Sequence, residues 1–212
     1  LTAYPGIDLS RTLPMELADL KQAYIAEAEK YAHVTYFFNG GYDHAIAGEI
    51  RTVVPSPDVK SYDETPTMSS AELTKAVIEN LREKKFDFTV LNIAAPDMVG
   101  HTGNLEAGIK CCAAMDKYVK QITEAYLKER GTVIITADHG NIEEMLDLKT
   151  GEIDTEHSVN AVPFILVSPL DYWKKIKLRK DGCLGDITPT ILELWGRKKP
   201  KEMTGKSLII KK

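Results

Sequence analysis

Hydrophobic positions along the chain change between helical spacing and short continuous runs. Between Glu16 and Lys30 apolar side chains recur every three or four residues, a spacing that predicts a helix. The next segment, HVTYFFNGG, is β-branched and aromatic and ends in two glycines, which predicts a short strand. From Tyr42 to Thr67 prolines and polar residues predict a long structured loop, in which only EIRTVVP resembles an extended segment.

The rest of the chain alternates more regularly between helices and buried strands. SSAELTKAVIENLREKK predicts a helix that begins at Ser69 or Ser70, and LEAGIKCCAAMDKYVKQITEAYLKE predicts a second helix that ends before Gly131. FDFTVLNIAA, GTVIITADHG and AVPFILVSP are nearly continuous apolar runs of strand length, and ITPTILELWG predicts a last short helix. This order predicts an α/β fold, with a mainly parallel sheet and helices on both faces.

Composition and charge narrow the classes of protein to which the chain can belong. Of its 212 residues, 43% are hydrophobic and 27% are charged, which is ordinary for a globular domain and argues against a disordered or fibrous chain. The net charge of −4 argues against nucleic acid as a partner, and no apolar run is long enough to span a membrane. Three cysteines without a pairing pattern and the lack of a visible signal peptide indicate a cytoplasmic protein.

Acidic and imidazole side chains lie beside three of the predicted strands. Asp97 and His101 follow the first central strand, Asp138 and His139 follow the second, and His157 precedes the third. Open α/β sheets bind ligands at the carboxyl ends of their strands, so we expect these five side chains to converge in one pocket. Taken singly, an aspartate after a strand is more often a helix cap, and a lone histidine is as often a structural residue.

Carboxylate oxygens and neutral imidazole nitrogens are ligands for divalent metal ions, and five of them exceed one tetrahedral set. We therefore predict two adjacent ions, one bound by Asp138 and His139 and the other by Asp97, His101 and His157. Such a pair is suited to phosphoryl chemistry. His33 and His44 lie outside this pattern.

Several strings that contain these residues carry a resemblance to a known family. SYDETP, PDMVGHTGN, TADHGN and PKEMTGKSLI are similar to strings in the C-terminal part of the cofactor-independent (2,3-bisphosphoglycerate-independent) phosphoglycerate mutases. These enzymes belong to the alkaline phosphatase superfamily, so the resemblance implies an alkaline phosphatase-like fold. The resemblance covers the chain from about Ala26 to Ile210. The DxxGH and TADHGN patterns by themselves are shared with other metallophosphatases, whereas SYDETP, PDMVGHTGN and PKEMTGKSLI point to the mutases.

The resemblance implies a role for each of the five candidate residues. Asp97, His101 and His157 resemble the ligands of one manganese ion, and Asp138 and His139 resemble half of the ligands of a second. Mg2+ or Zn2+ are the alternatives to Mn2+. In the family an aspartate and a nucleophilic serine near the N-terminus complete the second site, and a separate domain binds the substrate. Because the chain begins at Leu1 rather than Met, we expect residues 1–212 to be part of a longer polypeptide.

The implied reaction is the glycolytic interconversion of 3-phosphoglycerate and 2-phosphoglycerate through a phosphoserine, which makes the intact protein an isomerase. Residues 1–212 alone are expected to be inactive, since the serine and the substrate domain would lie elsewhere in the polypeptide. The family usually has an SPK string for which this chain has Ser56, Pro57 and Asp58, so Lys60 becomes the candidate cation for the substrate phosphate. The alternatives are a metal-dependent phosphatase or phosphopentomutase relative, and a metal-binding domain without catalysis.

Overall fold

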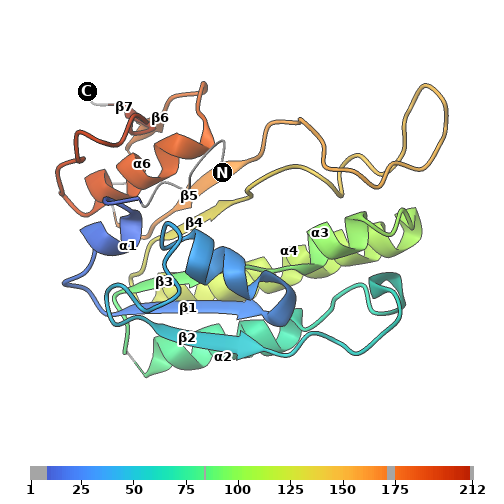
Figure 1. Ribbon diagram of the computed structural model, residues 1–212, viewed down its shortest axis with the longest axis horizontal. Helices are drawn as coiled ribbons and strands as arrows, with labels where there is room; N and C mark the ends of the chain where they lie inside the picture. The colour runs from blue at the N-terminus through green and yellow to red at the C-terminus, as the bar shows by residue number, and fades with distance from the viewer. Residues whose placement is uncertain (1–8, 84, 171–174, 211–212) are drawn as a thin grey trace, which may run out of the picture.

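The computed structural model describes residues 9–83, 85–170 and 175–210. Figure 1 shows strands and helices in layers, with a smaller group of elements near the C-terminus packed above the main sheet. The strands are β1 Gln22–Glu27, β2 Ile50–Val54, β3 Phe88–Leu91, β4 Val133–Thr136, β5 Phe164–Val167, β6 Lys177–Leu178 and β7 Ile209–Ile210. The α-helices are α1 Leu13–Glu16, α2 Ser70–Arg82, α3 Ala95–Gly100, α4 Leu105–Lys128 and α6 Ile187–Leu194. The shorter turns of helix are η1 Ala28–Lys30, η2 His33–Phe37, η3 Tyr62–Glu64 and η4 Leu184–Asp186.

Within the described residues the strands form three sheets. β1 lies in the centre of the largest, with β2 and β3 parallel to it on either side. β4 pairs antiparallel with β5, and β6 pairs antiparallel with β7. The prediction of a mainly parallel α/β fold is therefore confirmed, although β5 runs against its neighbour.

Both faces of the main sheet are covered. Helices α2 and α4 pack on one face, where Leu73, Val77 and Ile122 contact Ile25 of β1. On the other face Val34 and Phe38, from η2 and the residue after it, pack on Tyr24. Every residue of β1 is buried as a result.

The first predicted helix is wrong, because residues 22–27 form β1 rather than a helical turn. In a central strand every position is buried, so apolar residues need not alternate with polar ones. The first residue of the strand instead finds partners inside the protein: the Gln22 side chain donates hydrogen bonds to the carbonyl oxygens of Pro14 and Leu17. The sequence QAYIAE therefore shows no strand periodicity, and Ala and Glu favour a helix locally.

The strand predicted in HVTYFFNGG is also wrong, since His33–Phe37 form the π-helical turn η2. The predicted loop over residues 42–67 contains β2 and η3, and β2 coincides with the extended segment EIRTVV. The other predicted elements are confirmed as α2, α4, β3, β4, β5 and α6. No helix in the described part of the chain is long and apolar enough to cross a bilayer.

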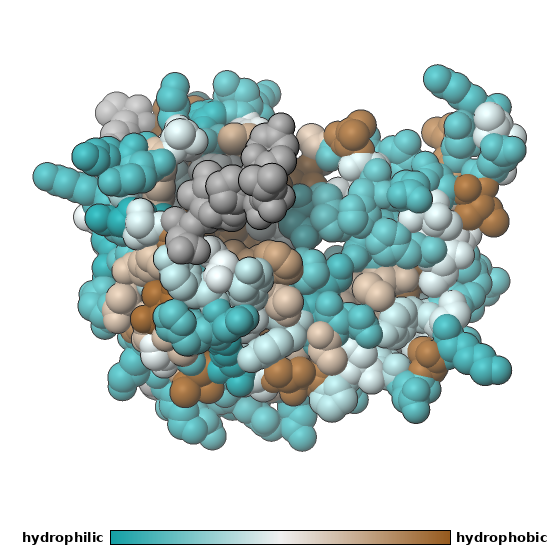
Figure 2. Space-filling model, in the orientation of Figure 1, coloured by the Kyte–Doolittle hydropathy of each residue, from teal (hydrophilic) through white to brown (hydrophobic). Residues whose placement is uncertain are grey.

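A long connection joins β4 to β5 and extends away from the body at the upper right of Figure 1. We call residues 137–163 the arm. Two isolated bridges, Gly140–Ser158 and Leu146–Ile153, hold its outgoing and returning halves together. The face of the molecule drawn in Figure 2 is mainly hydrophilic, with scattered hydrophobic residues.

Candidate metal centre

Asp97 lies in the short helix that follows β3, and His101 caps the end of that helix. Pro96 stands at the start of α3, where its fixed φ suits the first turn and its missing N–H costs no helical hydrogen bond. Asp97 is in that first turn, and His101 follows the end of α3 four residues later. Residues four apart on a helix share a face, so the carboxylate and the imidazole are directed to the same place.

The arm supplies the other candidate residues. Asp138 and His139 begin its outgoing half, and His157 lies on its returning half next to the Gly140–Ser158 bridge. Glu143 ties the two halves together: its carboxylate accepts hydrogen bonds from the Asn141 N–H at 2.8 Å and from the Ser158 hydroxyl. Burial opposes ionisation of Glu143, but these hydrogen bonds outweigh it and lower its pKa to about 2.

One carboxylate oxygen and two imidazole nitrogens from these segments meet in a nearly equilateral triangle. Asp97 Oδ1 is 3.1 Å from His101 Nε2 and 3.2 Å from His157 Nε2, and the two imidazole nitrogens are 3.1 Å apart. Ligands bound to one ion at about 2.1 Å are separated by about 3.0 Å at right angles and by about 3.4 Å in a tetrahedron. The three atoms therefore have the spacing of ligands on a single divalent ion.

The hydrogen bonding of His101 fits the same interpretation. Its Nδ1 is 2.7 Å from the Thr155 carbonyl oxygen, which can only accept a hydrogen bond. The Nδ1 atom must therefore carry the proton, which leaves Nε2 as a lone pair directed at Asp97 and His157. A backbone carbonyl behind an imidazole is the usual support of a metal-binding histidine.

Asp97 is held in its ionised form by two donors. Lys30 Nζ is 2.5 Å from its Oδ2, and the Asn141 side-chain amide donates to its Oδ1 at 2.8 Å. Burial acts to raise the pKa of Asp97, but the hydrogen bonds from Lys30 and Asn141 outweigh it and keep that pKa below its usual value. The side chain is 14% exposed, so this carboxylate is a partly buried anion at the centre of the cluster.

Asp138 and His139 lie beside the triangle. His139 stacks on His157 with ring centroids 3.7 Å apart, and its Nδ1 is 4.0 Å from Asp97 Oδ1. Its Nε2 is 3.5 Å from Asp138 Oδ2, and the Asp138 side chain is 59% exposed. Ligand-type atoms of Asp97, His139 and His157 all lie within 4.8 Å of one another, so these three side chains could also hold a metal ion.

The structure thus brings together all five residues expected at the sheet edge. Asp97, His101 and His157 form the triangle, and His139 and Asp138 lie beside it. Lys60 is exposed in the segment between β2 and η3. The cation that does contact Asp97 is Lys30, which the sequence analysis missed because it placed this residue inside a helix. Asn141 was also missed, although it lies two residues after His139 in the string TADHGN.

Gly100 and Asn141 depend on each other sterically. A Cβ atom on Gly100 would come within 2.1 Å of Asn141 Oδ1. Only a glycine therefore lets the Asn141 side chain lie against α3 and reach Asp97.

The profile of the metalloenzyme superfamily matches residues 7–199. The chain is 51% identical over 195 residues to a 2,3-bisphosphoglycerate-independent phosphoglycerate mutase of Clostridium kluyveri, and 48% identical over 214 residues to one of a Cyanothece species. It also resembles the crystal structure of Leishmania mexicana phosphoglycerate mutase at low cobalt concentration, with a TM-score of 0.87 and 32% sequence identity.

These similarities cover nearly all of this chain but a minor part of its relatives. The two alignments include 92% and 98% of this chain, and 37% and 40% of the Clostridium kluyveri and Cyanothece proteins. The structural match includes 96% of this chain and 40% of the Leishmania mexicana protein. The chain therefore spans about two fifths of the length of the relatives that it matches.

Proposed function

We propose, from the premise that this chain belongs to the metalloenzyme superfamily, that it is the metal-binding, phosphatase-like part of a longer phosphoglycerate mutase. The complete protein would interconvert 3-phosphoglycerate and 2-phosphoglycerate in the cytoplasm. Two divalent ions, Mn2+ in the first instance, would be its cofactors. The remainder of the polypeptide would supply the nucleophilic serine and the substrate-binding residues.

The observation that carries this proposal is the triangle of Asp97, His101 and His157. The three edges of this triangle are all 3.2 Å or shorter, which is the spacing of ligands on one divalent ion. The two curated relatives described above are named for the mutase reaction, which supports the choice of substrate.

Within this scheme Asp97, His101 and His157 would hold one ion, and Asp138 and His139 would hold part of the other. When bound, the ions would neutralise charge on the phosphoryl oxygens and lower the pKa of a serine hydroxyl so that it becomes a nucleophile. Lys30 and Asn141 orient the Asp97 carboxylate through direct hydrogen bonds. The Thr155 carbonyl keeps the proton of His101 on Nδ1 and away from the ligand nitrogen.

The test uses the protein made from its complete coding sequence, loaded with Mn2+. Formation of 2-phosphoglycerate is followed in a coupled assay, and release of inorganic phosphate is measured in parallel. His101→Ala should lower kcat/KM at least about 1000-fold and reduce the metal content, because the triangle loses one corner. His44→Ala is the matched control, since this histidine lies outside the cluster. It should leave kcat/KM and the metal content unchanged.

Release of inorganic phosphate without formation of 2-phosphoglycerate would show that the protein is a phosphatase and not a mutase. Full activity of His101→Ala would refute the metal site itself. Lys60 stays a prediction, and Lys60→Ala tests it: a loss of at least about tenfold in kcat/KM would place it near the substrate phosphate, and an unchanged kcat/KM would remove it from the site.

A further inference from the structure

The three corners of the metal triangle are supported to different degrees. Asp97 and His101 are fixed by helix α3 and its C-terminal cap, and the Thr155 carbonyl lies behind the His101 ring. The His157 side chain is 47% exposed, and among the described residues its Nδ1 has no hydrogen-bond partner. A metal-binding histidine usually has such a partner, which fixes the orientation of its ring. The position of His157 must therefore be set by the backbone beside it.

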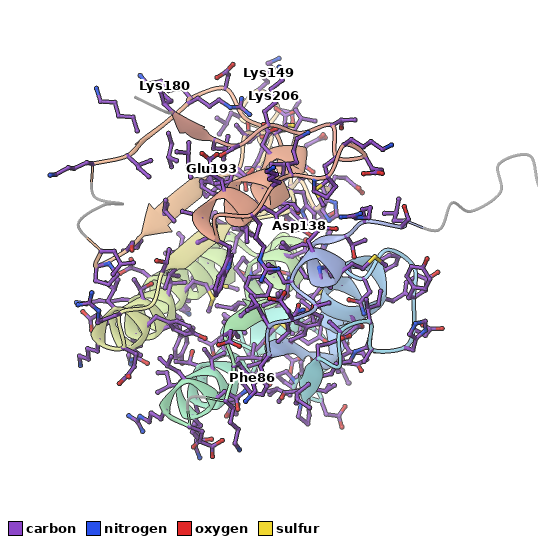
Figure 3. The ribbon with its side chains drawn as sticks, turned by 90° about the vertical axis from the view of Figure 1, so that its left-hand side faces the viewer. Phe86, Asp138, Lys149, Lys180, Glu193 and Lys206 are labelled. Carbon is purple, nitrogen blue, oxygen red and sulfur yellow. The ribbon has the colours of Figure 1, made fainter. Side chains whose placement is uncertain are left out.

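The backbone beside His157 belongs to the arm, which projects from the body. Figure 1 shows the arm leaving after β4 and returning to β5, and Figure 3 labels Asp138 near its base and Lys149 near its far end, well apart from each other. Two isolated bridges hold its halves together, and Ser158, the residue next to His157, belongs to the one nearer the base. His157 thus lies on a segment that a few local contacts hold in place.

Ser158 is held by three hydrogen bonds. Its N–H donates to the Gly140 carbonyl at 2.9 Å, and its hydroxyl donates to the Glu143 carboxylate. Its Oγ also accepts a hydrogen bond from the Asn160 N–H at 3.3 Å. Of these three contacts the one with Glu143 involves a charge, and hydrogen bonds to a charged group are roughly twice as strong as neutral ones. Glu143 therefore supplies the strongest tie to the residue next to His157.

The same carboxylate also binds the outgoing half of the arm. Its Oε2 accepts a hydrogen bond from the Asn141 N–H at 2.8 Å, and its Oε1 accepts a further one from the Asn160 side-chain amide at 3.2 Å. The carboxylate lies against Gly140, where a Cβ atom would come within 2.2 Å of both Glu143 Oε1 and Ser158 Oγ. Glycine at position 140 therefore permits this close approach, and one side chain joins both halves of the arm.

We infer that Glu143 is a positioning residue of the metal centre, which raises the affinity for Mn2+ by holding His157 at the third corner of the triangle. The inference rests on the metal site of the proposed function. Glu143 acts without touching the ion, since both of its oxygens accept hydrogen bonds from the arm. Without this carboxylate the returning half of the arm is less ordered, and part of the free energy of metal binding is then used to order it.

Titration with Mn2+ of the metal-free protein, made from its complete coding sequence, tests the inference. Glu143→Ala should lower the affinity of the tighter site about 10–100-fold, and Ser158→Ala, which cuts the same link, should also lower it. Glu144→Ala is the matched control, because it removes the same charge from the next residue, whose carboxylate accepts a hydrogen bond from Asn160. It should change the affinity by less than about threefold.

The His157→Ala protein separates positioning of His157 from other effects of the substitution. If Glu143 acts through His157, adding Glu143→Ala to this variant should change its Mn2+ affinity by less than about threefold. A further loss as large as in the parent protein would overturn the inference. Glu143 would then act through its charge or through Asn141, whose side chain supports Asp97.

Amide hydrogen exchange at Ser158 in the metal-free protein reports on the arm itself, because this N–H donates to Gly140. Exchange should be at least about tenfold faster in Glu143→Ala than in the parent. Equal exchange rates, or an unchanged Mn2+ affinity of Glu143→Ala, would overturn the inference and leave the metal site standing. A parent protein that binds no Mn2+ would instead refute the metal site, and the inference with it.

Discussion

Glu27 should make the protein less stable as the pH rises. It is the last residue of β1, its side chain is fully buried, and neither carboxylate oxygen meets a hydrogen-bond partner in the described structure. Burial raises the pKa of Glu27 to about 7, and the neighbouring Ser69 backbone and Ser56 hydroxyl only partly oppose this rise. The folded protein therefore binds this proton more tightly than the unfolded chain does.

The size of the effect follows from the difference between the two states. A rise in pKa from 4.5 to about 7 corresponds to about 3 kcal/mol, at about 1.4 kcal/mol for each pH unit. Because the folded-state pKa is the higher one, stability is greatest below about pH 4.5 and is lost as the pH rises through about 7. Glu27→Gln keeps the shape of the neutral acid and removes the charge, so the variant should be about 2–3 kcal/mol more stable than the parent at pH 8.

Urea unfolding followed by circular dichroism at pH 5 and pH 8 measures this difference. At pH 5 Glu27→Gln and the parent should agree within about 1 kcal/mol, since the folded parent is then largely protonated. Glu79→Gln is the control, because this α2 side chain is 56% exposed and should change stability by less than about 0.5 kcal/mol at either pH. A Glu27→Gln effect of equal size at both pH values would refute the reasoning.

Three further predictions concern the metal centre and the C-terminal part. Calorimetric titration of the 212-residue chain with Mn2+ should show one tight site and one clearly weaker site. Both affinities should fall as the pH is lowered, because protons compete with the metal for the imidazole nitrogens. Two equally tight sites would contradict this prediction. Gly100→Ala should lower Mn2+ affinity about 10–100-fold by displacing Asn141, and unchanged affinity would show that Asn141 does not support Asp97. Asp186→Ala should lower the free energy of unfolding, measured with urea at pH 7, by about 2–3 kcal/mol. The nearly buried Asp186 carboxylate accepts hydrogen bonds from Arg179 and from two backbone N–H groups, which the variant loses. A loss below about 0.5 kcal/mol would be inconsistent with this network.

The same carboxylate network should respond to acid. Three hydrogen bonds lower the pKa of Asp186 to about 2, with the backbone N–H of Lys206 as the largest cause. A depressed folded-state pKa stabilises the protein above the ordinary aspartate value, and this contribution is lost as the pH falls from about 4 toward 2.

The sequence by itself determined the elements whose pattern is local. The amphipathic spacing of α2 and α4 and the apolar runs of β3, β4 and β5 are visible because each is decided by residues close in the chain. The same is true of Asp97 and His101, which share a helical face, and of the adjacent pair Asp138 and His139. Recognition of these four residues as candidate metal ligands therefore required no tertiary information.

Where residues are buried on all sides, the local pattern failed. β1 reads as helix because its polar ends, Gln22 and Glu27, are buried by contacts from distant segments rather than by an alternation of faces. Lys30 was consequently assigned to a helix instead of the edge of the metal cluster. At such positions the local sequence is compatible with both a helix and a strand, and only the packing of the sheet decides which of them forms.

The tertiary structure alone decided how His157 reaches the centre. If β5 were parallel to β4, a residue preceding it would lie at the opposite edge of the sheet from Asp138. Because β5 is antiparallel, the arm returns to the edge that it left, and the Gly140–Ser158 bridge places His157 next to His139 and His101. Strand direction depends on hydrogen bonds between segments far apart in the chain, and so no periodicity in the sequence encodes it.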